Sequence, residues 1–90
     1  KQLDQRIAIR YHLDPLDFNE TGGYIAFRLE KAGLSKNIFT DQALEDIYRY
    51  SEGVPRKINN VCDIALLVGF SIKAQEIDAE IIRKVIDKSL

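Results

Sequence analysis

The chain has 90 residues, enough for one small domain with a single core. Its composition, 46% hydrophobic and 30% charged, is typical of a folded globular domain and excludes a disordered chain. The formal net charge of −1 gives no overall attraction for nucleic acid or an acidic membrane, so any recognition of anions has to be local. No apolar run approaches the roughly 20 residues that a membrane-spanning helix needs.

Residues 1–16 predict a strand followed by a hinge. Apolar and polar side chains alternate over residues 7–13, which favours a strand, and Asp14-Pro15 ends it in an extended linker. A lone strand cannot pair its own backbone groups, so the segment is either irregular or the edge of a sheet left in a parent protein. Because the chain starts at Lys1 instead of Met, we expect a piece of a longer protein.

Residues 17–90 predict four helices. Asp17 and Glu20 form a capping box before a helix over residues 18–32, although the pair Gly22-Gly23 costs it roughly 1 kcal/mol per glycine relative to Ala. Thr40 caps a helix over 41–50, a central apolar helix runs from 55 to about 72, and Asp78 caps the last one. This pattern predicts an all-α fold, a compact four-helix bundle.

Each helix has a stripe of residues expected to face the core. These are Ile25, Leu29 and Ala32, joined by either Phe18 or Gly22 one turn earlier; Ala43, Leu44, Ile47 and Tyr48; Ile58, Val61, Cys62, Ala65, Leu66 and Gly69; and Ile81, Ile82, Val85 and Ile86. Arg28, beside the first stripe, is interpreted as a solvated helix position. Cys62, within the third stripe, is interpreted as a small core residue and not as a nucleophile.

The third helix begins with charges that the helix dipole disfavours. Pro55 suits its first turn, but Arg56 and Lys57 follow where Asp or Glu is usual. Free backbone N–H groups and two cations together describe a site for an anion such as phosphate. The alternative is a pair of solvated surface cations tolerated at small cost.

Several chemistries find no support in the sequence. The chain has no glycine-rich phosphate loop with Lys and Ser/Thr. His12, the only histidine, has no spaced Cys, His or carboxylate companion, so we expect no metal site. Arginines 6, 10 and 56 are better leads, because an arginine can stabilise phosphoryl transfer at a site assembled elsewhere.

A set of short motifs covers nearly the whole chain. They are Gln5-Arg6-Ile7, the alternating strand, Leu13-Asp14-Pro15-Leu16, Tyr24-Ile25, Arg28-Leu29, Ala32-Gly33, Phe39, Ala43-Leu44 and the step Ser51-x-Gly53-x-Pro55-Arg56-x-x-Asn59. In these the chain resembles the C-terminal lid of an AAA+ ATPase, most closely the general secretion pathway ATPase A (ExeA-type) group. The Gly-x-Pro-Arg step is shared with other AAA+ proteins, so it is more specific for the superfamily than for the group.

The resemblance implies roles for particular residues. Arg56 matches the sensor 2 arginine, which reaches from the lid to the phosphates of ATP on the larger subdomain. Pro55 and adjoining apolar residues, with Leu16 and Ile25 among them, would border the nucleotide. Arg6 is the nearest match to an arginine finger that acts on a neighbouring subunit's ATP. Residues 1–16 would then be the last strand and hinge of the large subdomain, and residues 17–90 the lid.

The resemblance also sets expectations for cofactor, partners and location. The parent would be an ATPase using Mg-ATP, whereas this fragment lacks the Walker A, Walker B and sensor 1 motifs, so it should bind no nucleotide firmly and have no ATPase activity. The partners would be the parent's large subdomain, further copies in a homo-oligomer and an inner-membrane secretion partner, with the parent in the cytoplasm. The role could also be pilus assembly or transposition. The alternative function is a small helical module that binds protein or the phosphates of nucleic acid; the net charge disfavours nucleic acid.

Overall fold

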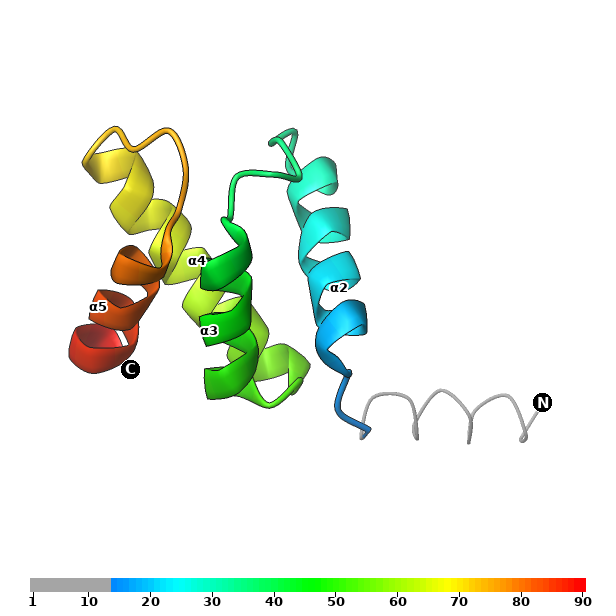
Figure 1. Ribbon diagram of the computed structural model, residues 1–90. Coiled ribbons are helices and arrows are strands. Elements are labelled where there is room, and N and C mark those ends of the chain that lie inside the picture. Colours follow the sequence, from blue (N-terminus) through cyan, green and yellow to red (C-terminus); the bar gives the residue numbers. More distant parts are fainter. Residues whose placement is uncertain (1–13) are drawn as a thin grey trace.

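The computed structural model describes residues 14–90, which form four helices (Figure 1). These are α2 (Phe18–Lys31), α3 (Asp41–Ser51), α4 (Pro55–Ser71) and α5 (Ala79–Ser89). The predicted all-α fold and all four helices are confirmed, with ends within one residue or so of the expected positions. The predicted strand over residues 7–13 and the proposed finger Arg6 lie outside the described residues.

Side-chain caps begin three of the helices as predicted. Asp17 and Glu20 exchange hydrogen bonds in a capping box, with N···O distances of 2.9 and 2.7 Å. Thr40 Oγ1 accepts from Ala43 N–H at 3.1 Å, and Asp78 Oδ1 accepts from Ile81 N–H at 3.0 Å. These bonds satisfy N–H groups that the first turn of a helix leaves free. They therefore explain why the helices begin where the sequence predicts.

Helix α2 ends at a glycine in the left-handed region. Gly33 has φ +79°, and the N–H of Leu34 reaches back to the carbonyl of Leu29 at 2.9 Å. A positive φ costs glycine little and other residues more, which is why glycine commonly follows the end of a helix. The predicted stop at this residue is confirmed.

The core lies where α3, α4 and α5 pack on one another, and α2 packs on α3 and α4. Almost all of the residues predicted to face inward are buried or half-buried, including Ile47, Ile58 and Val61 with no exposed surface. Ala32 was predicted wrongly, since it is exposed in the structure. It caps the C-terminal end of α2, where the last turn leaves the core.

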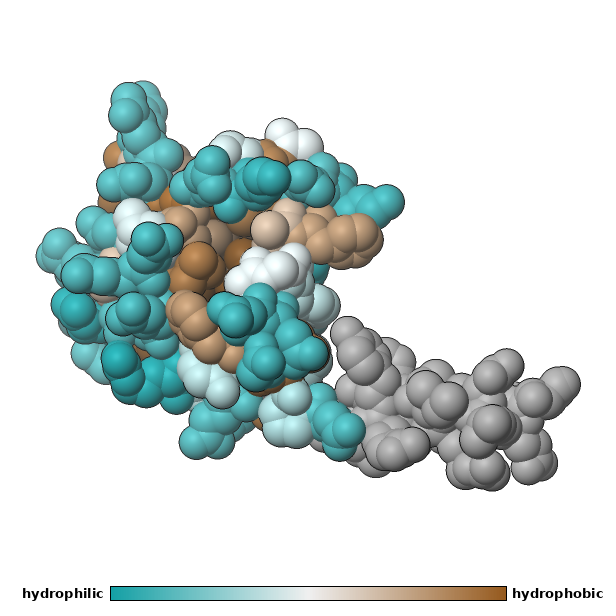
Figure 2. All heavy atoms as spheres, turned by 45° about the vertical axis from the view of Figure 1, so that its right-hand side comes forward, coloured by the Kyte–Doolittle hydropathy of each residue, from teal (hydrophilic) through white to brown (hydrophobic). Residues whose placement is uncertain are grey.

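The loops that precede α3 and α5 lie side by side. Ile77 N–H donates to Ile38 O at 2.7 Å, and Thr40 N–H donates to Ile77 O at 3.0 Å. Ile77 is 1% exposed and contacts Gly69 on α4, where a side-chain Cβ would overlap Ile77 Cδ1. These contacts fix the two helix starts to the central helix. Figure 2 shows the resulting surface, largely hydrophilic, with apolar atoms at the bottom of a hollow in the face turned to the viewer.

Candidate functional site

The start of α4 differs from the other three helix starts. Val54 occupies the cap position without a side-chain hydrogen bond, and the first turn has no acidic residue. Pro55 is the first helical residue, followed by the exposed Arg56 and Lys57. Within residues 14–90, Arg56 forms no ion pair. The free N–H groups of this turn and the guanidinium are therefore both available to an anion from outside the chain.

The turn that leads into α4 is fixed by buried polar contacts. Ser51 is fully buried, and its Oγ accepts a hydrogen bond from Gly53 N–H at 3.2 Å. Glu52 and Gly53 both have positive φ, 52° and 81°, which ends α3 and reverses the chain. Val54 N–H donates to Ser51 O at 3.0 Å, which joins this turn to the cationic helix start.

The segment before α2 packs directly on this turn. Leu16 N–H donates to Gly53 O at 2.8 Å, and a Cβ at position 53 would overlap the carbonyl oxygen of Leu16. The Leu16 side chain is 7% exposed and belongs to the core. The sequence motif therefore needs glycine at position 53 for two reasons: the positive φ and the close approach of another backbone.

A hydrogen-bonded junction between α2 and α4 lies one turn beyond Arg56. Asn59 Oδ1 accepts from Tyr24 Oη at 2.8 Å and from Arg28 Nη1 at 2.7 Å. Arg28 also lies 3.6 Å from Asp63, with its side chain 40% exposed. The interpretation of Arg28 as a solvated position was therefore wrong, because its guanidinium bridges two helices. The spacing of Tyr24 and Arg28, one helical turn apart, was the available signal.

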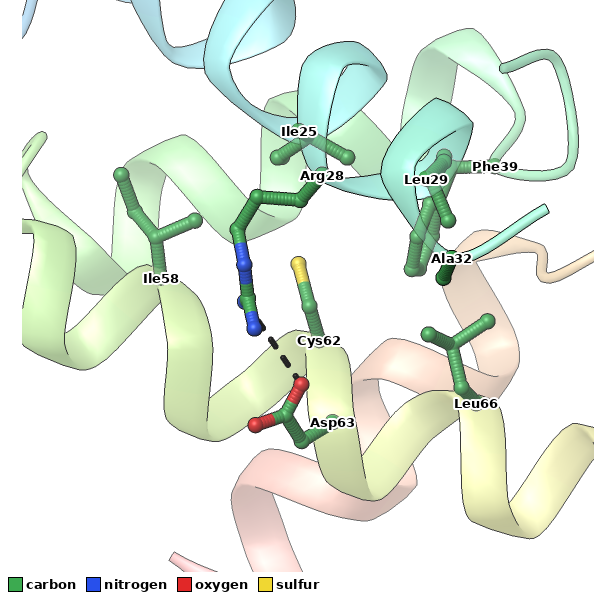
Figure 3. Close-up of a pocket in the computed structure, with 9 residues that line it drawn as sticks. All are labelled: Ile25, Arg28, Leu29, Ala32, Phe39, Ile58, Cys62, Asp63 and Leu66. Carbon is green, nitrogen blue, oxygen red and sulfur yellow. Dashed lines mark ion pairs between the residues drawn. The ribbon is translucent and has the colours of Figure 1, made fainter. Parts of the chain in front are cut away.

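A small hollow lies beside this junction, between α2 and α4 (Figure 3). Its volume is about 80 Å³. Sites for whole small-molecule ligands usually measure roughly 300–1,000 Å³, so this hollow cannot enclose a nucleotide. It is lined by Ile25, Arg28, Leu29, Ala32, Phe39, Ile58, Cys62, Asp63 and Leu66.

Cys62 in this hollow is not a reactive thiol. It is 5% exposed, and burial raises the pKa of its thiol to about 12, against the opposing effect of the nearby Arg28 charge. The thiolate, which is the nucleophilic form, is therefore scarce at neutral pH. The prediction of a core cysteine agrees with this placement.

The residues proposed from the resemblance fall into two groups. Pro55 and Arg56 lie at the accessible start of α4, and Asn59 follows Arg56 on the same face of the helix. Leu16 and Ile25 lie in the core, at 7% and 4% exposure. The structure brings Leu16 close to the α4 start through its hydrogen bond to Gly53.

Two structural findings concern other kinds of site. Among residues 14–90, no group of three His, Cys, Asp or Glu side chains is placed to hold a metal ion. None of α2–α5 combines the length and apolarity that crossing a membrane requires.

Fold and geometry thus define a small helical domain in which the segment before α2 packs against the turn that leads into a cationic helix start without a side-chain cap. Over 71 residues the chain is 48% identical to General secretion pathway protein A of Aeromonas hydrophila, which confirms the resemblance to the general secretion pathway ATPase A group. The matched stretch is 79% of this chain and 13% of that relative, so the chain spans only a small part of its length. No family model matches the chain, and no solved structure matches it.

Proposed function

We propose that this chain is the lid of an AAA+ ATPase related to General secretion pathway protein A, and that Arg56 is its sensor 2 residue. The observation that supports the proposal best is the start of α4, with an exposed arginine, no side-chain cap and no acidic residue in the first turn. The free backbone N–H groups of such a turn, and the arginine beside them, would find acceptors in a polyphosphate. The phosphate would be supplied by the large subdomain of the parent chain.

The lid would couple nucleotide to movement through its hinge. ATP bound on the large subdomain attracts Arg56 by charge-assisted hydrogen bonds, and hydrolysis removes the γ-phosphate that holds it. Pro55 borders the nucleotide, while the buried Leu16 and Ile25 form the wall behind it. Because Leu16 is bonded to Gly53, motion of the hinge reaches the α4 start directly.

The remaining assignments extend this proposal to the parent. Mg-ATP is its cofactor, and Arg6 acts as an arginine finger toward the neighbouring copy in a homo-oligomer. The parent works in the cytoplasm beside a secretion machine of the inner membrane. Secretion is favoured over pilus assembly or transposition because the matching relative is a general secretion pathway protein.

The test is ATP turnover by the full-length parent carrying Arg56→Ala. Loss of one phosphate contact made in the transition state costs about 2.7–4 kcal/mol, so turnover should fall about 100- to 1,000-fold. The matched control is Lys57→Ala, which removes the adjacent exposed cation and should leave turnover within a few-fold. Unchanged turnover for Arg56→Ala would reject the sensor assignment.

The competing function, a module that binds nucleic acid phosphates, has a separate test. The fragment offers only a few phosphate contacts, so both ATP and a random duplex should bind at millimolar concentration or more weakly. Titrations at about 50 and 200 mM salt measure this directly. Micromolar binding of DNA that persists at the higher salt would favour the binding module.

A further inference from the structure

A groove separate from the proposed nucleotide site lies between the N-terminal halves of α2 and α3. Its volume is about 470 Å³. It is lined by Phe18, Asn19, Gly22 and Gly23 of α2 and by Asp41, Leu44 and Glu45 of α3. None of these residues contributes to the α4 start or to the junction at Asn59.

The two adjacent glycines have no structural role within residues 14–90. Gly22 and Gly23 lie inside α2 without positive φ, and a Cβ built on either meets no atom within 4 Å. At Gly53 and Gly69, by contrast, a Cβ would overlap neighbouring atoms. Glycine weakens a helix interior, and its usual compensation is a close approach by another backbone. The space beside this pair is open to such an approach from outside.

The groove also has a fixed apolar wall. Phe18 is 42% exposed, and its ring contacts Tyr48 edge-on, with centroids 5.7 Å apart. Leu44, half-buried, forms the facing side. An aromatic ring held in place and partly exposed provides contact area at little entropic cost.

The charges of the groove are all negative. Asp41 and Glu45 are exposed, no Lys or Arg lines the groove, and neither carboxylate forms an ion pair in the described part of the chain. This charge disfavours nucleic acid, acidic membranes and acidic peptides. Because both carboxylates lie on α3, it favours a partner with lysine or arginine along one side of an apolar strip.

We propose that this groove binds a short amphipathic helix of a partner protein. Apolar side chains of that helix pack on Phe18, Leu44 and the strip formed by Gly22 and Gly23, and its flanking cations pair with Asp41 and Glu45. An apolar groove between two helices accepts a helical partner in this manner. The lining spans residues 18–23 of α2, about 7.5 Å of helix at 1.5 Å per residue, which suits roughly one and a half turns of the partner.

The test titrates the 90-residue chain with two synthetic helical peptides, followed by backbone amide NMR. Both peptides carry the same Leu/Ala face, flanked in one by Lys and in the other by Glu. The Lys peptide should shift the amides of residues 18–23 and 41–45 and bind at least about tenfold more tightly than the Glu peptide, a preference that salt weakens. Equal binding of the two peptides, or shifts centred on the exposed apolar residues Leu67, Phe70 and Ile72, would overturn the proposal.

Variants separate docking from folding. Gly23→Leu adds a side chain to the strip, and its Cβ has open space around it. The variant should therefore leave thermal stability unchanged or raised, and it should weaken binding of the Lys peptide at least about tenfold. Glu30→Leu, an exposed position near the other end of α2, is the matched control and should bind normally. Asp41→Lys combined with Glu45→Lys should reverse the preference to the Glu peptide. If Gly23→Leu bound the Lys peptide as tightly as the wild type does, the groove would be rejected as the binding site.

Discussion

The backbone N–H of Leu16 donates a 2.8 Å hydrogen bond to the carbonyl oxygen of Gly53, and this contact joins the segment before α2 to the turn before α4. The two residues are far apart in sequence, yet a single added Cβ at Gly53 would overlap Leu16. The segment that leads into the domain is therefore held against the turn that precedes the cationic start of α4.

Gly53→Ala tests this contact. The left-handed backbone alone costs a residue with a Cβ about 1–2 kcal/mol, and the overlap with Leu16 adds to it. We expect the melting temperature to fall by about 8 °C or more, since 1 kcal/mol shifts a domain of this size by about 4–8 °C. Gly22→Ala is the control, because its Cβ meets open space and should raise the melting temperature. Similar melting temperatures for the two variants would contradict the role given to Gly53.

The junction between α2 and α4 should be energetically coupled. Tyr24→Phe and Asn59→Ala each remove one side of the 2.8 Å hydrogen bond between the Tyr24 hydroxyl and Asn59 Oδ1. A double-mutant cycle in urea should give a coupling of about 0.5–1.5 kcal/mol. A matched cycle pairs Asn59→Ala with Arg49→Ala, whose guanidinium contacts Asp46 and not Asn59, and should give none. Equal couplings in the two cycles would show that Tyr24 and Asn59 do not act as a pair.

Cys62 should make stability fall at high pH. Its folded pKa of about 12 lies above the model-compound value of 9.0, so the folded state holds the proton more tightly than the unfolded chain does. The stabilisation is complete below about pH 9 and is lost as pH rises from 9 towards 12. The free energy of unfolding of the wild type should therefore decline more steeply over this range than that of Cys62→Ala. Parallel pH profiles would show that the thiol is not buried in solution.

The thiol should also be inert in the folded protein. A disulfide reagent at pH 8 should label Cys62 only on unfolding, because burial both shields the sulfur and suppresses the thiolate. The labelling rate should follow the unfolded population as urea is added. Rapid labelling of the native chain would contradict the packing of α4 against α2.

Local signals in the sequence were enough to predict the helices. Asp17, Thr40 and Asp78 each bond to the backbone N–H three residues on, so the caps can be recognised without knowing the tertiary structure. The glycine at position 33 is a similarly local signal. The periodic apolar stripes then predicted the part of the core that lies in the helices, except at Ala32, where the helix ends. They did not predict Leu16, Phe39 and Ile77, which join the core from outside the helices.

Contacts between distant segments could not be predicted in this way. Leu16 reaches Gly53, and Arg28 reaches Asn59, only after the helices have packed. The sequence around Arg28 predicts only a charged side chain in solvent, because its bridging role depends on where α4 lies. For the same reason the groove beside Gly22 and Gly23 has no sequence signal beyond the glycines, which were interpreted only as a weakness of α2.

The central claim, that the start of α4 faces bound ATP, is tested most directly by hydrogen exchange in the full-length parent. The amides of Arg56 and Lys57 lie in an uncapped first turn and should exchange quickly without nucleotide. A non-hydrolysable ATP analogue should slow their exchange, and Arg56→Ala should remove most of that protection while leaving the protection of the large subdomain's phosphate loop in place. The account is contradicted if the analogue protects the phosphate loop but leaves exchange at Arg56 and Lys57 unchanged.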